Sequence, residues 1–110
     1  NMGMYDTIRS SVPHFKGTYQ TKDLECLMCD YWIDPAGHLF EIDLSYTQDF
    51  DRIEGFRLIY VKNGNHGKVR PTYIRKYVRI YNEDEEFILQ IHDGKVVAYQ
   101  KHEQDRQVRQ

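Results

Sequence analysis

Cys26 and Cys29, separated by two residues, have the spacing in this chain that is most typical of chemistry. Two thiolates at this spacing can chelate a metal ion, and the same pair can form a thiol–disulfide couple. A structural zinc site needs four ligands, but the chain has no second cysteine pair and no histidines at ligand spacing. A redox pair needs a helix after a parallel strand, and no such pattern surrounds these residues. The sequence favours two reduced, buried or half-buried thiols, leaves both as weak metal candidates, and predicts no cofactor.

Alternating aromatic and basic residues form a second candidate site. The candidate binding residues are Tyr73, Arg75, Tyr77, Arg79 and Tyr81 on one face of a predicted strand, with His66, Lys68 and Arg70 in the loop before it. Rings that stack on bases, beside arginines that neutralise phosphate, are typical of sheets that bind single-stranded nucleic acid. Such a face can equally be solvated, with its arginines paired to acids on neighbouring strands such as Glu41 and Asp43. The net charge of -2 favours the solvated face, with a binding surface for protein or nucleic acid as the alternative.

Recognisable catalytic motifs are missing from the sequence. The five histidines form neither a His-Glu-x-x-His motif nor a Ser/His/Asp arrangement. Gly64 and Gly67 lack the following Lys-Ser/Thr of a phosphate-binding loop. Asp49 and Asp51 lack the context of a calcium site. We therefore predict a protein that is not an enzyme.

The stretch from Phe87 to Gln100 predicts a β-hairpin. Asp93-Gly94 supplies the positive φ angles of a two-residue turn, and that turn sets the register. The predicted cross-strand pairs are His92–Lys95, Ile91–Val96, Leu89–Ala98 and Phe87–Gln100. One face of this hairpin is almost wholly apolar, so further strands must cover it.

The rest of the chain also reads mainly as strands. A turn at Asp34-Pro35-Ala36-Gly37 predicts a second hairpin, followed by an alternating strand to Tyr46. Further strands are expected at 4–9, 18–21, 56–62 and 72–82, with residues 56–62 central in the sheet and residues 47–55 as a connection. The predicted core is Ile33, Phe40, Ile42, Leu44, Leu58, Tyr60, Ile74, Val78, Ile80, Phe87, Leu89, Ile91 and Val96.

These patterns predict a mainly β fold, α+β at most. We expect one small domain over residues 1–102, built from hairpins into an antiparallel sheet of about six strands. Residues 22–30 are expected to form one helical turn or an irregular segment, with at most one short helix near Lys22 to Cys29, because Leu24, Leu27 and Met28 share a face only at helical spacing. Residues 103–110 are expected to be a polar tail. The 110 residues suffice for one core without staples.

The expected location is the cytoplasm. Apolar runs are far shorter than the roughly 20 residues that span a bilayer, and no secretory signal precedes the domain. Two cysteines without an export signal are typical of reduced thiols.

Two stretches resemble a known group of proteins. Met2 to Ile8 (Met-Gly-Met-Tyr-Asp-Thr-Ile) and Tyr19 to Leu24 (Tyr-Gln-Thr-Lys-Asp-Leu), followed by a hairpin of the form Asp-x-x-Gly-x-Leu, resemble small uncharacterised proteins encoded by bacteriophages and prophages. The late Asp-Gly-Lys-Val hairpin is similar in them. The resemblance brings no activity with it. It implies a phage accessory protein in the bacterial cytoplasm, a setting where small phage proteins often bind host proteins.

The leading hypothesis is a non-catalytic phage accessory protein that binds a host protein, as a host-takeover or anti-defence inhibitor. Its binding surface would be an exposed sheet face or the loop Asn63–Pro71. One alternative is a single-stranded nucleic-acid binder that uses the Tyr/Arg strand. The other is a virion structural or assembly protein, or a homo-oligomer joined through sheet edges.

Overall fold

A computed structural model describes residues 4–44, 46–54, 57–62, 64 and 66–103. Ten strands and one short 3₁₀ turn make up the regular structure of these residues. The elements are β1 (Asp6–Ser10), η1 (Pro13–Phe15), β2 (Gly17–Thr21), β3 (Asp30–Ile33), β4 (Leu39–Ile42), β5 (Tyr46–Glu54), β6 (Arg57–Lys62), β7 (Val69–Pro71), β8 (Lys76–Tyr81), β9 (Glu86–His92) and β10 (Lys95–His102). The mainly β fold predicted from the sequence is confirmed.

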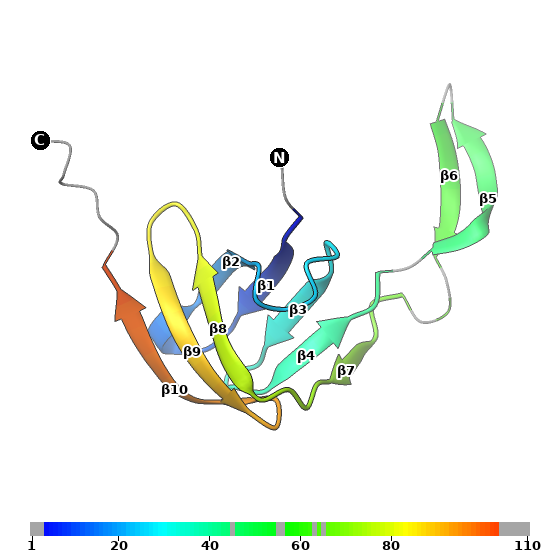
Figure 1. Ribbon diagram of the computed structural model, residues 1–110. Coiled ribbons are helices and arrows are strands. Elements are labelled where there is room, and N and C mark those ends of the chain that lie inside the picture. The colour runs from blue at the N-terminus through cyan, green and yellow to red at the C-terminus, as the bar shows by residue number, and fades with distance from the viewer. Residues whose placement is uncertain (1–3, 45, 55–56, 63, 65, 104–110) are drawn as a thin grey trace, which may run out of the picture.

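Eight of the strands form one sheet in the order β10-β9-β8-β2-β1-β3-β4-β7. Only the pair β1–β3 is parallel, and every other pair in this sheet is antiparallel. The remaining strands, β5 and β6, form a separate two-stranded hairpin that projects away beyond β4 and β7 (Figure 1). The sheet is therefore larger than the six strands expected, and its edge strand β7 was not among the predicted strands.

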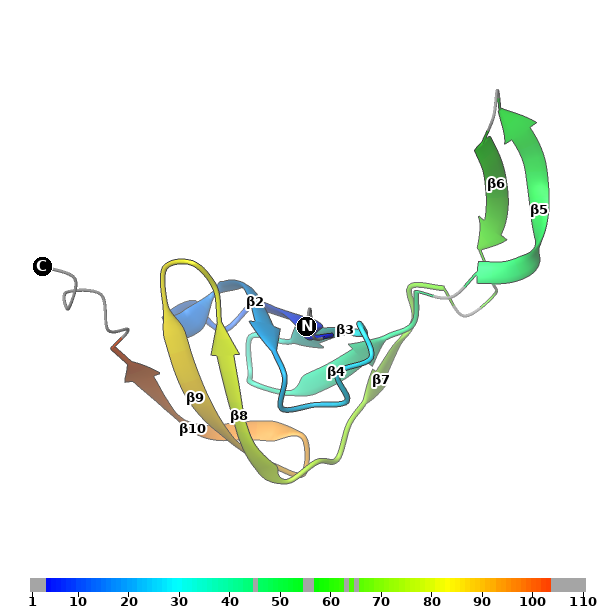
Figure 2. The same ribbon diagram turned by 45° about the horizontal axis from the view of Figure 1, so that its top comes forward.

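The sheet curls so that its two ends approach each other at the turns (Figure 2). A β-bridge links His38 to Lys95, and the amide of Val96 donates to the carbonyl of Gly37 at 2.9 Å. Gly94 has φ of +76°, and a Cβ on it would lie 2.0 Å from the carbonyl oxygen of Thr72. This junction accepts only glycine at position 94, because any larger residue meets backbone at once.

The buried core lies inside this curl. Its members are Ile8, Phe15, Tyr19, Tyr31, Ile33, Leu39, Val78, Ile80, Phe87, Leu89 and Ile91. Six of the predicted core residues are fully buried, and Ile74 and Val96 pack against the core while partly buried. Five core residues were not predicted: Ile8, Tyr19 and Tyr31 lie in short strands, Phe15 lies in the 3₁₀ turn, and Leu39 lies on the face of its strand opposite to the one predicted. The side chains of Leu58 and Tyr60 lie outside the described residues.

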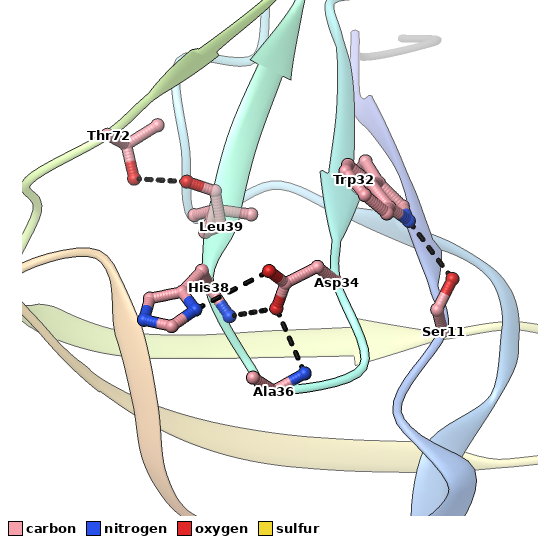
Figure 3. Close-up of polar contacts among 7 residues, drawn as sticks. All are labelled: Ser11, Trp32, Asp34, Ala36, His38, Leu39 and Thr72. Atoms are coloured by element: carbon pink, nitrogen blue, oxygen red, sulfur yellow. Dashed lines mark hydrogen bonds and ion pairs between the residues drawn. The ribbon is translucent and has the colours of Figure 1, made fainter.

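The residues of β4 that point toward the core are not the ones predicted. Asp34 fixes the preceding turn, since its Oδ1 accepts the amides of Ala36 at 3.0 Å and His38 at 2.8 Å (Figure 3). The register then places Leu39 opposite Ile33 on the core side. Phe40, expected in the core, is half-buried and stacks on Trp32 with ring centroids 5.3 Å apart.

The two other residues predicted for the core from this strand are also misplaced. Ile42 is half-buried and Leu44 is 44% exposed. Leu39 and Phe40 are adjacent apolar residues, so the alternation of side chains along the strand does not decide which of the two faces the core.

The register of the β9–β10 hairpin is correct only next to its turn. His92–Lys95 and Ile91–Val96 pair as predicted, but a bulge at Val97 shifts every later pair. Leu89 therefore lies opposite Tyr99, and Phe87 lies opposite Lys101. The Tyr99 ring packs 5.2 Å from the ring of Phe15, so the extra residue moves an aromatic ring onto the core side.

Of the two alternatives for the segment near Lys22 to Cys29, a helical turn or an irregular structure, the structure has the irregular one, with left-handed φ angles at Cys26 (+57°) and Met28 (+60°). Three further expectations about elements are wrong. Residues 46–54, expected mostly as a connection, form β5. β6 pairs only with β5 and is not central in the main sheet, and the expected strand at 72–82 begins only at Lys76.

The phase of β4 can be tested by a matched pair of substitutions. We expect Leu39→Ala to lower the free energy of unfolding by about 2–5 kcal/mol, because it opens a cavity in a closed core. Phe40→Ala should cost less, about 0.5–1.5 kcal/mol for the lost ring pair. Urea denaturation measures both. A larger loss for Phe40→Ala would contradict this assignment of faces.

Candidate functional site

The carboxylate of Asp6 holds the segment between β2 and β3. Asp6 is fully buried at the start of β1. Its Oδ2 accepts the backbone amide of Cys26 at 2.7 Å, and its Oδ1 accepts those of Leu27 at 3.1 Å and Cys29 at 2.9 Å. Hydrogen bonds to an ionised acceptor are stronger than neutral ones, so three of them compensate the burial of one charge. The backbone of residues 26–29 is thereby fixed from β1.

This anchored backbone presents two apolar side chains to solvent. Leu27 is 59% exposed and Met28 is 66% exposed. The left-handed conformations at Cys26 and Met28 are uncommon for residues with a side chain, and Asp6 supplies hydrogen bonds that hold them in place. We call residues 26–29 the apolar loop.

The two cysteines lie in the apolar loop and are free thiols. The Sγ of Cys26 donates to the carbonyl of Lys22 at 2.9 Å. Burial raises the pKa of the Cys29 thiol, and the charges of Asp6 and Glu41 raise it further. A raised pKa disfavours the thiolate that metal binding and redox exchange require. Among the described residues no group of three or more His, Cys, Asp or Glu could hold a metal ion.

The strand β8 carries part of the predicted Tyr/Arg face. Tyr77 points outward and is 64% exposed, whereas Tyr81 is half-buried. The Nε of Arg79 lies 3.2 Å from Glu86 Oε2 on β9, so its charge is paired within the sheet. The backbone amide of Arg79 donates to Asp23 Oδ2 at 2.8 Å.

The contact between Asp23 and Arg79 closes a gap in the sheet. β8 pairs with β2 at only one position, Gln20 with Tyr81. The segment between β2 and β3 runs alongside this gap, between β8 and β4 (Figure 2). Its Asp23 carboxylate supplies to β8 the acceptor that a longer β2 would have supplied.

Tyr73 and Arg75 lie before β8, in the irregular residues 72–75. Tyr73 is 74% exposed, the largest exposure among the exposed large apolar and aromatic side chains described. Arg75 is exposed and forms no ion pair with a described residue. The predicted alternation of exposed and buried side chains therefore holds along β8. Tyr73 and Arg75 precede this strand and do not take part in its backbone pairing.

The predicted loop residues lie at the other edge of the sheet. Arg70 in β7 contacts Glu41 at 3.3 Å and Asp43 at 3.8 Å. Lys68 is exposed and His66 is half-buried in the turn before β7. The eight sequence candidates thus form two groups, one around β8 and one at β7. Glu41 and Asp43 were predicted to pair with the arginines of the Tyr/Arg face, but their partner is Arg70 in β7.

Three residues that the sequence did not single out complete the surface beside β8. Leu24 and Glu25, from the segment before the apolar loop, line a surface cavity of about 410 Å³ together with Tyr31 and Tyr73. Burial raises the pKa of the Tyr31 phenol, and the charges of Asp6, Glu25 and Glu41 add to this effect. The sequence left this segment open as a helical turn or an irregular structure, so nothing in the pattern placed Leu24 or Glu25 against Tyr73.

Comparisons with protein-family models, with curated proteins and with solved structures give no significant match. Within the described residues no helix is long and apolar enough to cross a membrane.

The role of Asp6 can be tested by removing its charge. We expect Asp6→Asn to lower the free energy of unfolding by about 1.5–3 kcal/mol, because an amide cannot accept all three backbone donors. Amide hydrogen exchange at Cys26, Leu27 and Cys29 should accelerate locally. Asp30→Asn is the matched control: its partner Arg9, at 2.8 Å, is 54% exposed, so the loss should stay below about 1 kcal/mol. Equal effects of the two changes would refute the anchoring role.

The raised pKa of Cys29 predicts its reactivity. In a Cys26→Ser variant, the pH profile of Cys29 alkylation should have its inflection above the ordinary value of 9.0. At any pH below that inflection the folded protein then holds less thiolate than the same variant unfolded in urea. Iodoacetamide modification followed by mass spectrometry measures both profiles. Coinciding profiles would show that burial and the nearby carboxylates do not act on this thiol.

Proposed function

We propose that this protein is a non-catalytic phage accessory protein that binds a host protein in the bacterial cytoplasm. The observation that carries the proposal is the exposure of two tyrosine rings, Tyr73 at 74% and Tyr77 at 64%; Tyr73 shares a surface cavity with Leu24 and Glu25 from the segment between β2 and β3. Tyrosine, methionine and arginine are enriched at protein interfaces, and tyrosine is common among the residues that dominate binding energy. The phage setting comes from the resemblance of Met2 to Ile8 and Tyr19 to Leu24.

The backbone beneath this surface supports the proposal. Asp6 holds the apolar loop, and Asp23 joins the same segment to β8. Side chains displayed on a fixed backbone lose less conformational entropy on binding than side chains on a mobile loop. The exposed rings of Tyr73 and Tyr77 and the apolar loop are thus arranged before a partner arrives.

The charges favour a protein over a nucleic acid as the partner. Arg79 is paired with Glu86, and Arg70 is paired with Glu41 and Asp43. A phosphate would have to compete with these carboxylates, and the net charge of -2 provides no general attraction. Of the arginines on the predicted face, Arg75 alone keeps an unpaired guanidinium among the described residues.

The proposal can be tested by affinity purification from the bacterial host, with and without nuclease. We expect one dominant host protein that survives nuclease treatment. The purified partner should bind a Tyr73→Ala/Tyr77→Ala variant at least roughly tenfold more weakly in a calorimetric titration, since both rings would lose their contacts.

The control for this experiment is Tyr5→Ala, which removes a 36% exposed tyrosine that lies before β1. It should leave the affinity unchanged. Loss of all captured material after nuclease would transfer the function to single-stranded nucleic acid. Capture of this chain alone would point instead to self-association through β7 or β10, the two edge strands of the main sheet.

A further inference from the structure

The cavity beside Tyr73 has the composition of a site for a cationic side chain. It measures about 410 Å³ and lies where the β2–β3 segment meets β3, β4, β7 and the residues before β8. This volume falls within the roughly 300–1,000 Å³ of ordinary ligand pockets. Two aromatic rings, Tyr31 and Tyr73, and two carboxylates, Glu25 and Glu41, belong to its wall.

The hydroxyl of Tyr31 is a polar group without a partner. Tyr31 is only 4% exposed, and its hydroxyl forms no hydrogen bond with any residue that the structure describes. No side-chain nitrogen or oxygen fully shielded from solvent lacks a partner among these residues, so the hydroxyl keeps some contact with solvent. Tyr31 is one of the residues that line the cavity. A buried phenol left this way can receive a hydrogen bond from a ligand.

The charges around the cavity are mainly negative. The pKa of Tyr31 is raised first by burial and then by Asp6, the Cys29 thiol, Glu25 and Glu41, and all of these contributions act in the same direction. Glu25 is exposed and forms no ion pair with a described residue, while Glu41 contacts Arg70 at 3.3 Å. Lys76 is the one basic residue among the described residues of the wall, and it too forms no ion pair with a described residue.

We propose that this cavity receives an arginine side chain of the partner protein. The planar guanidinium can lie against the rings of Tyr31 and Tyr73, donate to the Tyr31 hydroxyl, and pair with the carboxylates of Glu25 and Glu41. A lysine ammonium lacks the flat surface and the forked donors that these groups suit. The inference rests on the proposed function, because Tyr73 belongs to both the cavity and the host-binding surface.

The direct test is an NMR titration of the full chain with Nα-acetyl-arginine amide. We expect saturable shifts at the amides of Glu25, Tyr31 and Tyr73, which weaken as salt is added. The uncharged isostere Nα-acetyl-citrulline amide should produce none of these shifts, and Nα-acetyl-lysine amide should bind more weakly. Binding of citrulline or lysine as tight as that of arginine, or no saturable shift, would overturn the assignment.

Two matched variants locate the effect. Glu25→Gln should weaken binding of the arginine probe roughly two- to fivefold, as expected for the loss of one solvent-accessible ion pair. Glu103→Gln removes the same charge from an exposed residue after β10 and should leave the affinity unchanged. Equal affinities of the two variants would exclude the cavity as the site of binding. Both substitutions are at exposed positions, and the unchanged dispersion of the amide spectrum verifies folding.

The two proposals fail in different ways. If the arginine probe does not bind while the host protein is still captured through Tyr73 and Tyr77, the cavity assignment is wrong and the proposed function stands. If the probe binds with the expected selectivity but no host protein is captured, the proposed function is wrong and the cavity remains an arginine site.

Discussion

The buried carboxylate of Asp6 connects the two parts of the surface on which function is proposed. Its three backbone hydrogen bonds fix residues 26–29 against β1. The segment between β2 and β3, which contains these residues, also contacts β8, because Asp23 accepts a hydrogen bond from the backbone amide of Arg79. This contact lies where β2 and β8 share only one paired position. Without these contacts, the single pair between Gln20 and Tyr81 would be the backbone pairing that joins β8 to β2. The cavity beside Tyr73 would also lose the wall that Leu24 and Glu25 form.

A second junction closes the opposite side of the curl. The turns after β3 and β9 meet through the His38–Lys95 bridge and the hydrogen bond from the Leu39 amide to the Gly94 carbonyl. Gly94 also lies directly against Thr72. This contact fixes the start of the chain segment that leads through Tyr73 into β8. Both ends of the candidate surface are therefore positioned by contacts between residues far apart in sequence: Asp6 with the apolar loop, and Gly94 with Thr72.

That dependence explains which features the sequence could predict. The turns at Asp34 and at Asp93-Gly94 are encoded by neighbouring residues, and their flanking strands follow from them. The bulge at Val97 and the inward phase of Leu39 depend on how the curled sheet packs, because alternation fits either phase. On the surface, the exposure of Tyr77 follows from strand alternation. The cavity could not be predicted from strand alternation, because one of its walls is an irregular segment that is held in place by Asp6.

The arginines show why the same residue types can indicate different partners. A Tyr/Arg strand is typical of nucleic-acid platforms when its guanidiniums are free for phosphate. Here Arg79 is paired with Glu86, while the ring of Tyr77 on the same strand stays exposed. Beside it, Glu25 and the unpartnered hydroxyl of Tyr31 leave negative charge and a hydrogen-bond acceptor at the cavity. The proposed arginine site accords with this arrangement, because carboxylates beside aromatic rings favour a cationic side chain over phosphate.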